Sequence, residues 1–261
     1  MNNTARKLLP VKLKVLIAKL LSNEVTGWFI SAIYGNAIPH RGAKIYTDSN
    51  RIRRRTVSDI FFGIYERAEI DQVISYLNPA LDVIELGGSI GVNSLHIRHC
   101  LAKKQKLLVV EADPELVKVL RYNFKMNVAE ENVMILNKAI DYSGNESVPF
   151  AVNESSLSGH VATAACGESA SIINVQATSL GKIIKEYGFD DYALVSDIEG
   201  MEIPIFIEDQ AALKNCKQIF LEIDGVSYNN TDYNVDDVIN IICGQGFKIV
   251  DRYFNCVVFS K

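Results

Sequence analysis

Two short stretches of this 261-residue chain place chemically reactive side chains beside glycine. The first, residues 85–94, reads ELGGSIGVNS, and the second, residues 197–202, reads DIEGME. A glycine turn after a buried strand lets a ligand approach the backbone, and the free N–H groups of a following helix bind polar groups. Carboxylates grouped as in the second stretch can position or deprotonate a hydroxyl. Together they predict a site for a nucleoside-type cofactor with acid–base chemistry beside it.

Glu111 follows the glycine turn at a spacing typical of nucleoside-binding folds. The apolar run Leu107–Val110 predicts a buried strand, and Glu111 ends it. In this architecture an acid about twenty residues after the turn binds the two ribose hydroxyls. Gly87, Gly88 and Gly91 are expected to remove Cβ atoms where the chain turns and the ligand approaches.

Alternating strand and helix patterns must position these residues. Apolar runs predict strands over 82–87, 106–111, 132–138, 192–197 and 217–223, and helices over 91–103, 114–126, 179–187, 203–214 and 234–244. Two closing strands, 246–251 and 254–259, lie too close together for a helical crossover, so they must be antiparallel. The expected fold class is α/β, with a mostly parallel seven-stranded Rossmann-like sheet and an antiparallel C-terminal hairpin.

Two short strands, 146–152 and 171–177, interrupt this alternation. They flank residues 153–170, a loop rich in Ser, Ala and Gly. Loops of this length inside a compact domain are usually functional or mobile. We expect this loop and the N-terminal segment to border the acceptor pocket, and mobility of the loop to control access to it.

The N-terminal segment differs from the rest of the chain in charge. Residues 1–55 hold eleven Lys and Arg against Glu24 and Asp48, a balance of +9 in a chain of net charge −4. We expect a basic amphipathic helical extension, residues 1–58, before a catalytic domain at 59–261. Residues 6–34 are expected to be helical with a break at Gly27, residues 35–55 to be a loop, and 61–77 to be a helix.

A basic N-terminal extension before an acidic catalytic domain favours contact with an anionic partner, such as lipid headgroups, an acidic glycan or nucleic acid. A solvated helix face is the alternative. The apolar side of residues 6–21 would contact a membrane surface, pack on the catalytic domain or pair with a second copy in a homo-oligomer. Of these partners, nucleic acid is not expected.

Cysteine usage and hydropathy bear on location. The five cysteines are scattered and include no C-x-x-C pair, which favours reduced thiols in the cytoplasm. No apolar run reaches the roughly eighteen residues of a transmembrane helix. We expect a cytoplasmic protein, peripheral to the inner face of the membrane where residues 6–21 bind it.

The motifs resemble those of the FkbM-type S-adenosylmethionine-dependent methyltransferases. The resemblance spans roughly residues 60–260. It rests on residues 83–91 (VIELGGSIG), 110–114 (VEADP), 137–141 (NKAID), 197–202 (DIEGME) and 221–223 (LEI). It implies the class I methyltransferase fold with S-adenosylmethionine as cofactor. It also implies methyl transfer to a hydroxyl oxygen, commonly on a sugar of a surface polysaccharide or glycoconjugate.

The resemblance implies roles for individual residues. Glu85 would lie near the cofactor ammonium group, Glu111 would bind the ribose hydroxyls, and the 139–141 turn would border the adenine. The expected cofactor-binding residues are Glu85, Gly87, Gly88, Ser89, Gly91, Asn93, Glu111, Ala112, Ala139, Asp141 and Asp197.

Three residues are candidates for positioning or deprotonating the acceptor hydroxyl. Asp197 is the first, Glu199 the second and His160 the third. Asp197, Glu199 and Glu222 also offer oxygen ligands that Mg²⁺ could use, but we expect no metal ion.

Two further functions compete with methyl transfer. Residues 87–91 also match G-x-S-x-G, the nucleophile elbow of α/β-hydrolases, which makes Ser89 a nucleophile with Asp141 and His160 as partners. His160 then stands in a loop instead of after a late strand, which disfavours a hydrolase. The other alternative is a non-catalytic protein that has the cofactor-binding fold and binds a partner through its basic N-terminal extension.

Overall fold

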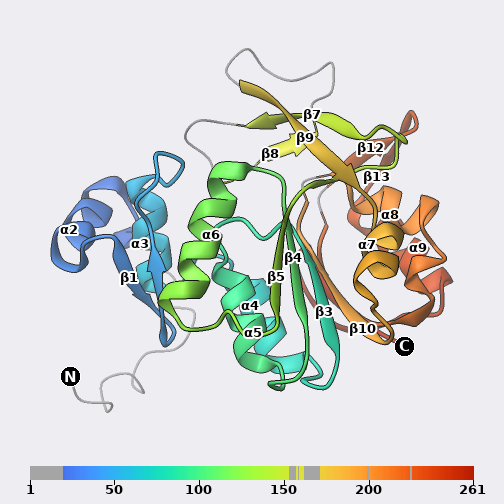
Figure 1. Ribbon diagram of the computed structural model, residues 1–261, viewed down its shortest axis with the longest axis horizontal. Helices are drawn as coiled ribbons and strands as arrows, with labels where there is room; N and C mark the ends of the chain where they lie inside the picture. The colour runs from blue at the N-terminus through green and yellow to red at the C-terminus, as the bar shows by residue number, and fades with distance from the viewer. Residues whose placement is uncertain (1–19, 153–156, 158, 162–170, 199, 224) are drawn as a thin grey trace.

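A seven-stranded sheet forms the centre of the protein (Figure 1). The computed structural model describes residues 20–152, 157, 159–161, 171–198, 200–223 and 225–261. The strand order is β14-β15-β11-β10-β3-β4-β5. The parallel strands are β3 (Asp82–Leu86), β4 (Leu107–Glu111), β5 (Val133–Asn137), β10 (Tyr192–Ser196) and β11 (Cys216–Glu222).

The sheet closes with an antiparallel hairpin. β15 (Cys256–Ser260) lies between β11 and the edge strand β14 (Lys248–Tyr253), and it runs antiparallel to both. The expected α/β class, with its mostly parallel seven-stranded Rossmann-like sheet and its C-terminal hairpin, is confirmed.

Helices cover both faces of the sheet, as Figure 1 shows. The helices of one face are α4 (Arg67–Tyr76), α5 (Val92–Cys100) and α6 (Pro114–Met126), and those of the other are α7 (Leu180–Tyr187), α8 (Glu202–Glu208) and α9 (Val235–Gly244). Val83 and Val109 pack with the first set, and their neighbours Ile84 and Leu108 pack with the second. This alternation follows from the two-residue period of a strand, and it explains why the strands are apolar throughout.

A second, four-stranded sheet lies at the carboxyl ends of β3 and β4 (Figure 1). Its strands, in order, are β6 (Ala139–Ile140), β9 (Ser171–Thr178), β7 (Ser147–Val152) and β8 (Gly159–Val161). Phe150 and Val175 pack with Ala112 and Ala139, so this sheet is anchored beside the tip of β4. The strands expected at 146–152 and 171–177 are confirmed. Most of the loop expected at 153–170 lies outside the described residues.

The prediction of a loop over residues 35–55 is wrong. This region forms the hairpin of β1 (Ala37–His40) and β2 (Ala43–Tyr46), and α3 (Arg54–Phe62) begins at its end. Arg41 and Gly42 adopt positive φ values of 44° and 95°, which close the two-residue turn. The fully buried side chains of Ile38 and Ile45 then fix the hairpin against the core.

The break expected at Gly27 is also wrong, because α2 (Glu24–Tyr34) runs through this residue. A Cβ atom at Gly27 would lie 1.7 Å from the carbonyl oxygen of Arg54. The glycine therefore allows the first turn of α3 to cross α2 at backbone distance, and it does not interrupt the helix.

The single helix expected over 61–77 is divided in two. Gly63 ends α3 with a φ of 67°, and Glu66 precedes α4 with a φ of 48°. These left-handed residues turn the chain sharply between the two helices. Helix α3 also runs across the expected domain boundary between residues 58 and 59, and the division into two domains stays a prediction.

Two smaller differences concern the C-terminal part. Helix α8 ends at Glu208 and is followed by a 3₁₀ turn at Ala212–Asn215, where one helix was expected over 203–214. β12 (Val226–Tyr228) and β13 (Thr231–Tyr233) form a short antiparallel hairpin that was not predicted. Among the residues described, no helix has both the length and the apolar character needed to cross a bilayer. The amphipathic helix expected at 6–21 lies almost wholly outside the described residues.

The crossing of α2 and α3 predicts the effect of Gly27→Ala. The added methyl group would overlap the Arg54 carbonyl, so we expect the free energy of unfolding to fall by about 1–3 kcal/mol. Chemical denaturation measures this change. Gly244→Ala is the matched control, because nothing lies within 4 Å of the position that its Cβ atom would occupy. We expect the control to gain up to about 1 kcal/mol from helix propensity. Equal stability of Gly27→Ala and the wild type would contradict the close crossing.

Candidate active site

The carboxyl ends of three neighbouring strands meet at one point of the sheet. The Gly87 N–H donates to the Val110 carbonyl oxygen at 2.9 Å, which joins the glycine turn after β3 to the end of β4. The Asp197 N–H donates to the Leu86 carbonyl oxygen at 3.0 Å, which joins the end of β10 to that of β3. The two stretches singled out in the sequence therefore lie side by side, where ligands bind in open α/β sheets.

Glycine is required in this turn by the packing of the chain itself. Gly87 has a φ of 86°, and a Cβ atom there would lie 1.7 Å from the Asp197 carbonyl oxygen. A Cβ at Gly88 would lie 2.2 Å from Val109 Cγ1. A Cβ at Gly91 would lie 3.2 Å from Leu120 Cγ. The expected sharp turn is confirmed, but what approaches these three positions so closely is the protein's own backbone and core.

Glu111 joins the glycine turn to the tip of β4 through its carboxylate. Oε2 accepts the Ser89 N–H at 2.7 Å, and Oε1 accepts the Asp113 N–H at 2.8 Å. The residue is 7% exposed. Burial raises the pKa of Glu111 to about 7, although the two backbone N–H groups act in the opposite direction. Its orientation is thus fixed by the backbone of both strand tips.

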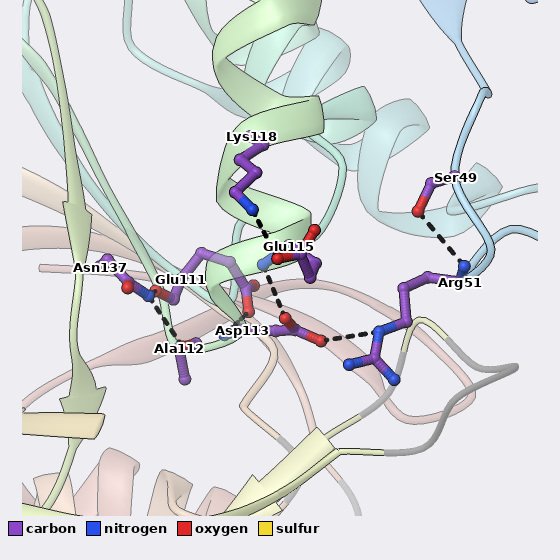
Figure 2. A network of polar contacts seen from close by, with 8 residues as sticks. All are labelled: Ser49, Arg51, Glu111, Ala112, Asp113, Glu115, Lys118 and Asn137. Atoms are coloured by element: carbon purple, nitrogen blue, oxygen red, sulfur yellow. Dashed lines mark hydrogen bonds and ion pairs between the residues drawn. The ribbon is translucent and has the colours of Figure 1, made fainter. Parts of the chain in front are cut away.

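Figure 2 shows the polar network that holds the residues after β4. Asp113 caps α6 by accepting the Glu115 N–H at 2.8 Å, as the Asp113-Pro114 sequence indicates. The other oxygen of Asp113 lies 3.4 Å from Nε of Arg51, and both side chains are largely buried. Asn137 Nδ2 donates to the Ala112 carbonyl oxygen at 2.8 Å. An arginine of the N-terminal segment thereby supports the residues that orient Glu111.

A cavity of about 1110 Å³ opens at these strand tips. The predicted site residues that line it are Gly87, Ser89, Glu111, Ala112, Ala139 and Asp197. Glu85 and Asn93 line a second cavity, of about 20 Å³, which shares Gly87 and Asp197 with the first. The structure therefore brings together predicted site residues that lie in or just after β3, β4, β6 and β10.

The remaining predicted residues have other positions. The Asp141 carboxylate accepts hydrogen bonds from the backbone N–H and the hydroxyl of Ser143. His160 lies in β8 opposite Ala151, and its side chain is outside the described part of the structure. Glu199 also lies outside the described residues. The Ser89 hydroxyl is 3.4 Å from the Tyr65 hydroxyl, so the nucleophile and the acid of the hydrolase alternative both have other partners.

The third carboxylate of the second stretch, Glu202, has a structural role. It is almost fully buried and accepts the N–H groups of Ile198 and Gly200 at 3.0 and 2.9 Å. These bonds hold the loop after β10 in a closed turn. Asp197, at the start of that loop, instead lines the cavity.

Glu85 is a buried acid beneath the glycine turn. It is 2% exposed, and its Oε2 has no hydrogen-bond partner within the described residues. Burial raises the pKa of Glu85, and the charges of Glu66, Glu111 and Asp197 act in the same direction. A buried oxygen without a partner is costly, so it marks a place where a polar or positively charged ligand group would be stabilised.

A second acidic wall, of which the sequence indicated only Glu222, comes from α4, β11 and β15. One ligand atom each from Glu69, Glu222 and Cys256 lies within 4.8 Å of the others. Burial and a hydrogen bond to Glu222 raise the pKa of Glu69 to about 8. Glu222 also accepts from Asn255 Nδ2 at 3.0 Å. Carboxylate oxygens and a thiol can coordinate a divalent cation, but here these groups interact with one another.

Glu66 is a further residue that the site prediction missed. Its Oε2 accepts the Asn93 N–H at 3.0 Å, in the first turn of α5. Burial raises the pKa of Glu66 to about 7. No local pattern in the sequence reveals this contact, because it depends on the left-handed turn between α3 and α4.

The raised carboxyl pKa values predict that the free protein loses stability as pH rises. In the unfolded chain these groups ionise near 4.5, whereas Glu69 in the folded chain ionises near 8. Between these values the folded state binds more protons, so its stability falls with increasing pH. We expect Glu69→Gln to flatten this dependence and to raise Tm at about pH 8 by on the order of 2–4 °C. Calorimetry across this range measures both effects. Glu130→Gln, at an exposed site, is the control, and equal slopes for both variants would contradict the prediction.

Comparison with known proteins identifies the family. The model of the methyltransferase FkbM domain matches residues 86–249, more than half of the chain. No match is found among the curated proteins. The crystal structure of EvdMO1 aligns with a TM-score of 0.43 at 12% identity, and covers 96% of this chain but only 47% of that one. Magnesium protoporphyrin IX methyltransferase (ChlM) from Synechocystis PCC 6803 aligns with a TM-score of 0.43 at 11% identity over 94% of each chain.

The family match includes the end of β3, the glycine turn, Glu111 and the loop after β10. It thus covers the strand tips that enclose the cavity. The chain belongs to the FkbM methyltransferase family, and its cofactor is S-adenosylmethionine.

Proposed function

We propose that this methyltransferase transfers the methyl group of S-adenosylmethionine to a hydroxyl oxygen of a sugar, in a surface polysaccharide or glycoconjugate. The observation that carries the proposal is the position of Asp197. It lines the same cavity as Glu111 and Gly87, at the end of the strand between β3 and β11. A carboxylate at this position can orient a hydroxyl and accept its proton.

The residues around the strand tips fit the cofactor. When bound, S-adenosylmethionine supplies an electrophilic methyl group on a positively charged sulfonium. Its ammonium group is also positive, and the buried Glu85 and the half-buried Glu66 line the two cavities in which such charges would be stabilised. We propose that Glu111, held by the N–H groups of Ser89 and Asp113, accepts the two ribose hydroxyls. Its remaining lone pairs are available for these bonds.

Asp197 has the proton-handling role in this proposal. One of its carboxylate oxygens would accept the proton of the acceptor hydroxyl, while the hydroxyl oxygen would bond to the methyl carbon as the bond from that carbon to sulfur breaks. The charge of Asp197 raises the pKa of Tyr65, Glu85 and Cys256, which indicates that its carboxylate faces the cavity. A carboxylate is a weak base for a sugar hydroxyl, so positioning contributes a large part of the rate. Glu199 and His160 stay secondary candidates.

The lining of the cavity suggests the chemistry of the acceptor. Tyr253, the last residue of β14, and Phe254, which follows it, line the cavity and are largely exposed. Aromatic rings of this kind provide flat, amphipathic surfaces on which a sugar ring can lie. Glu69, Glu222 and Asp251 line the same cavity. A sugar acid or sugar phosphate would be repelled by these carboxylates, so we propose an acceptor that is neutral or carries an amine.

Mass spectrometry tests the reaction. The purified protein with S-adenosylmethionine should add the mass of one CH₂ unit to a neutral or amine-bearing sugar, and fragmentation should place it on oxygen. We expect Asp197→Asn to lower kcat about 10²–10⁴-fold. Asp191→Asn, before the opposite end of β10 and paired with Lys217, is the matched control with unchanged kcat. Methylation on nitrogen or carbon, or full activity of Asp197→Asn, would reject the proposal.

Calorimetric titration with S-adenosylmethionine tests the role of Glu111. Glu111→Gln removes the charge and one acceptor while it keeps the shape of the side chain. We expect the Kd for the cofactor to rise about 10–100-fold, the loss typical of a hydrogen bond to a charged group. Glu130→Gln, which is exposed before β5, should bind as the wild type does. An unchanged Kd in Glu111→Gln would show that the ribose is bound elsewhere.

A further inference from the structure

Helix α2 presents its apolar side to solvent. Val25, Trp28, Phe29 and Ile33 are 65%, 55%, 55% and 74% exposed. Their spacing places them on one side of the helix, which we name the α2 apolar face. The opposite side holds Ile30, which is buried in the core. In Figure 1, α2 lies at the outer end of the molecule, with α3 between it and the rest of the chain.

This arrangement reverses the usual orientation of a surface helix. Monomeric soluble proteins rarely expose a contiguous apolar patch with several large side chains, and such patches mark interaction sites. Leu20 and Leu21, immediately before α2, are also exposed at 72% and 44%. The patch includes aromatic residues, and Trp28 and Phe29 pack edge to face with ring centroids 4.9 Å apart.

Three exposed arginines lie at the start of α3, the helix that crosses α2. Arg53, Arg54 and Arg55 are exposed at the start of α3, which crosses α2 at Gly27. Arg54 Nη1 donates to Ser31 Oγ at 2.7 Å, so its guanidinium lies against α2. Ser31 is three residues after Trp28 and is therefore its neighbour on the helix surface. The only acid in α2 is Glu24.

We propose that the α2 apolar face docks on the surface of an anionic lipid bilayer. A single helix side with aromatic and aliphatic residues, flanked by cations, matches a helix that lies in the plane of the interface. Tryptophan is enriched at that depth, and arginine binds lipid phosphates through paired N–H groups. This docking does not depend on the methyl acceptor.

Trp28 is a built-in probe, because it is the only tryptophan of the chain. The full-length protein is mixed with vesicles of phosphatidylcholine, or of phosphatidylcholine with phosphatidylglycerol. We expect the emission of Trp28 to shift to the blue and the protein to sediment with the anionic vesicles only. Added salt should weaken this binding, since screening reduces the contribution of the arginines.

Two double variants separate the apolar from the electrostatic contribution to vesicle binding. Phe29→Ser with Ile33→Ser should weaken vesicle binding at least about tenfold, since two large apolar side chains no longer leave water. Arg53→Gln with Arg55→Gln leaves the apolar face intact and should remove the preference for anionic vesicles. Val128→Ser is the matched control, because Val128 is equally apolar, is 90% exposed and follows α6, away from α2.

Three results would overturn the proposal. In the first, the emission of Trp28 is unchanged by anionic vesicles. In the second, it is already blue-shifted without lipid and depends on protein concentration, which means that a second copy covers the face. In the third, the shift without lipid is independent of concentration, which means that the chain covers its own face.

Discussion

The tips of β3 and β10 touch through their backbones, and the site depends on this contact. Gly87 lies so close to the Asp197 carbonyl oxygen that no side chain fits between them. The hydrogen bond from the Asp197 N–H to Leu86 extends the parallel pairing by one residue beyond the two strands. As a result, the residue that begins the glycine turn and Asp197, the proposed base, have a fixed separation. Preorganisation of this kind supplies much of the rate in a displacement reaction.

The N-terminal segment stabilises the same point from the other side. Asn123 of α6 is fully buried, accepts the Tyr46 N–H at 2.6 Å and donates to the Ile90 carbonyl oxygen at 2.7 Å. One side chain thus connects the β1–β2 hairpin to the glycine turn. Arg51 makes a second connection through Asp113. The segment that sequence reasoning separated from the catalytic domain therefore contributes to the geometry of the site.

Local patterns predicted the features that depend on local physics. The apolar strands and the antiparallel hairpin follow from two-residue periodicity and short connections. The hairpin of β12 and β13 was missed, although Asn229 and Asn230 favour the left-handed turn that it uses. For this hairpin the sequence does contain a local signal, in two adjacent asparagines.

Other features could not be predicted, because they arise from contacts between distant residues. In the sequence, Gly27 indicates a helix break. Only its close contact with the Arg54 backbone shows why a glycine stands inside a continuous helix. Glu69 and Cys256 are separated by 187 residues, and nothing near either one indicates that they share a wall of the cavity. The glycines of the turn were explained by ligand approach, whereas the core residues Val109 and Leu120 already require two of them.

The distribution of acids connects the fold to the cofactor. Glu111 is buried, Glu66 and Glu69 are half-buried, and the pKa values of the three are raised to about 7 or 8, so their ionisation is unfavourable in a cavity lined by other acids. The sulfonium and ammonium groups of S-adenosylmethionine would reduce this penalty, because a carboxylate beside either group gains an opposite charge in a weakly screened environment. Binding of S-adenosylmethionine therefore favours the ionised form of the acids.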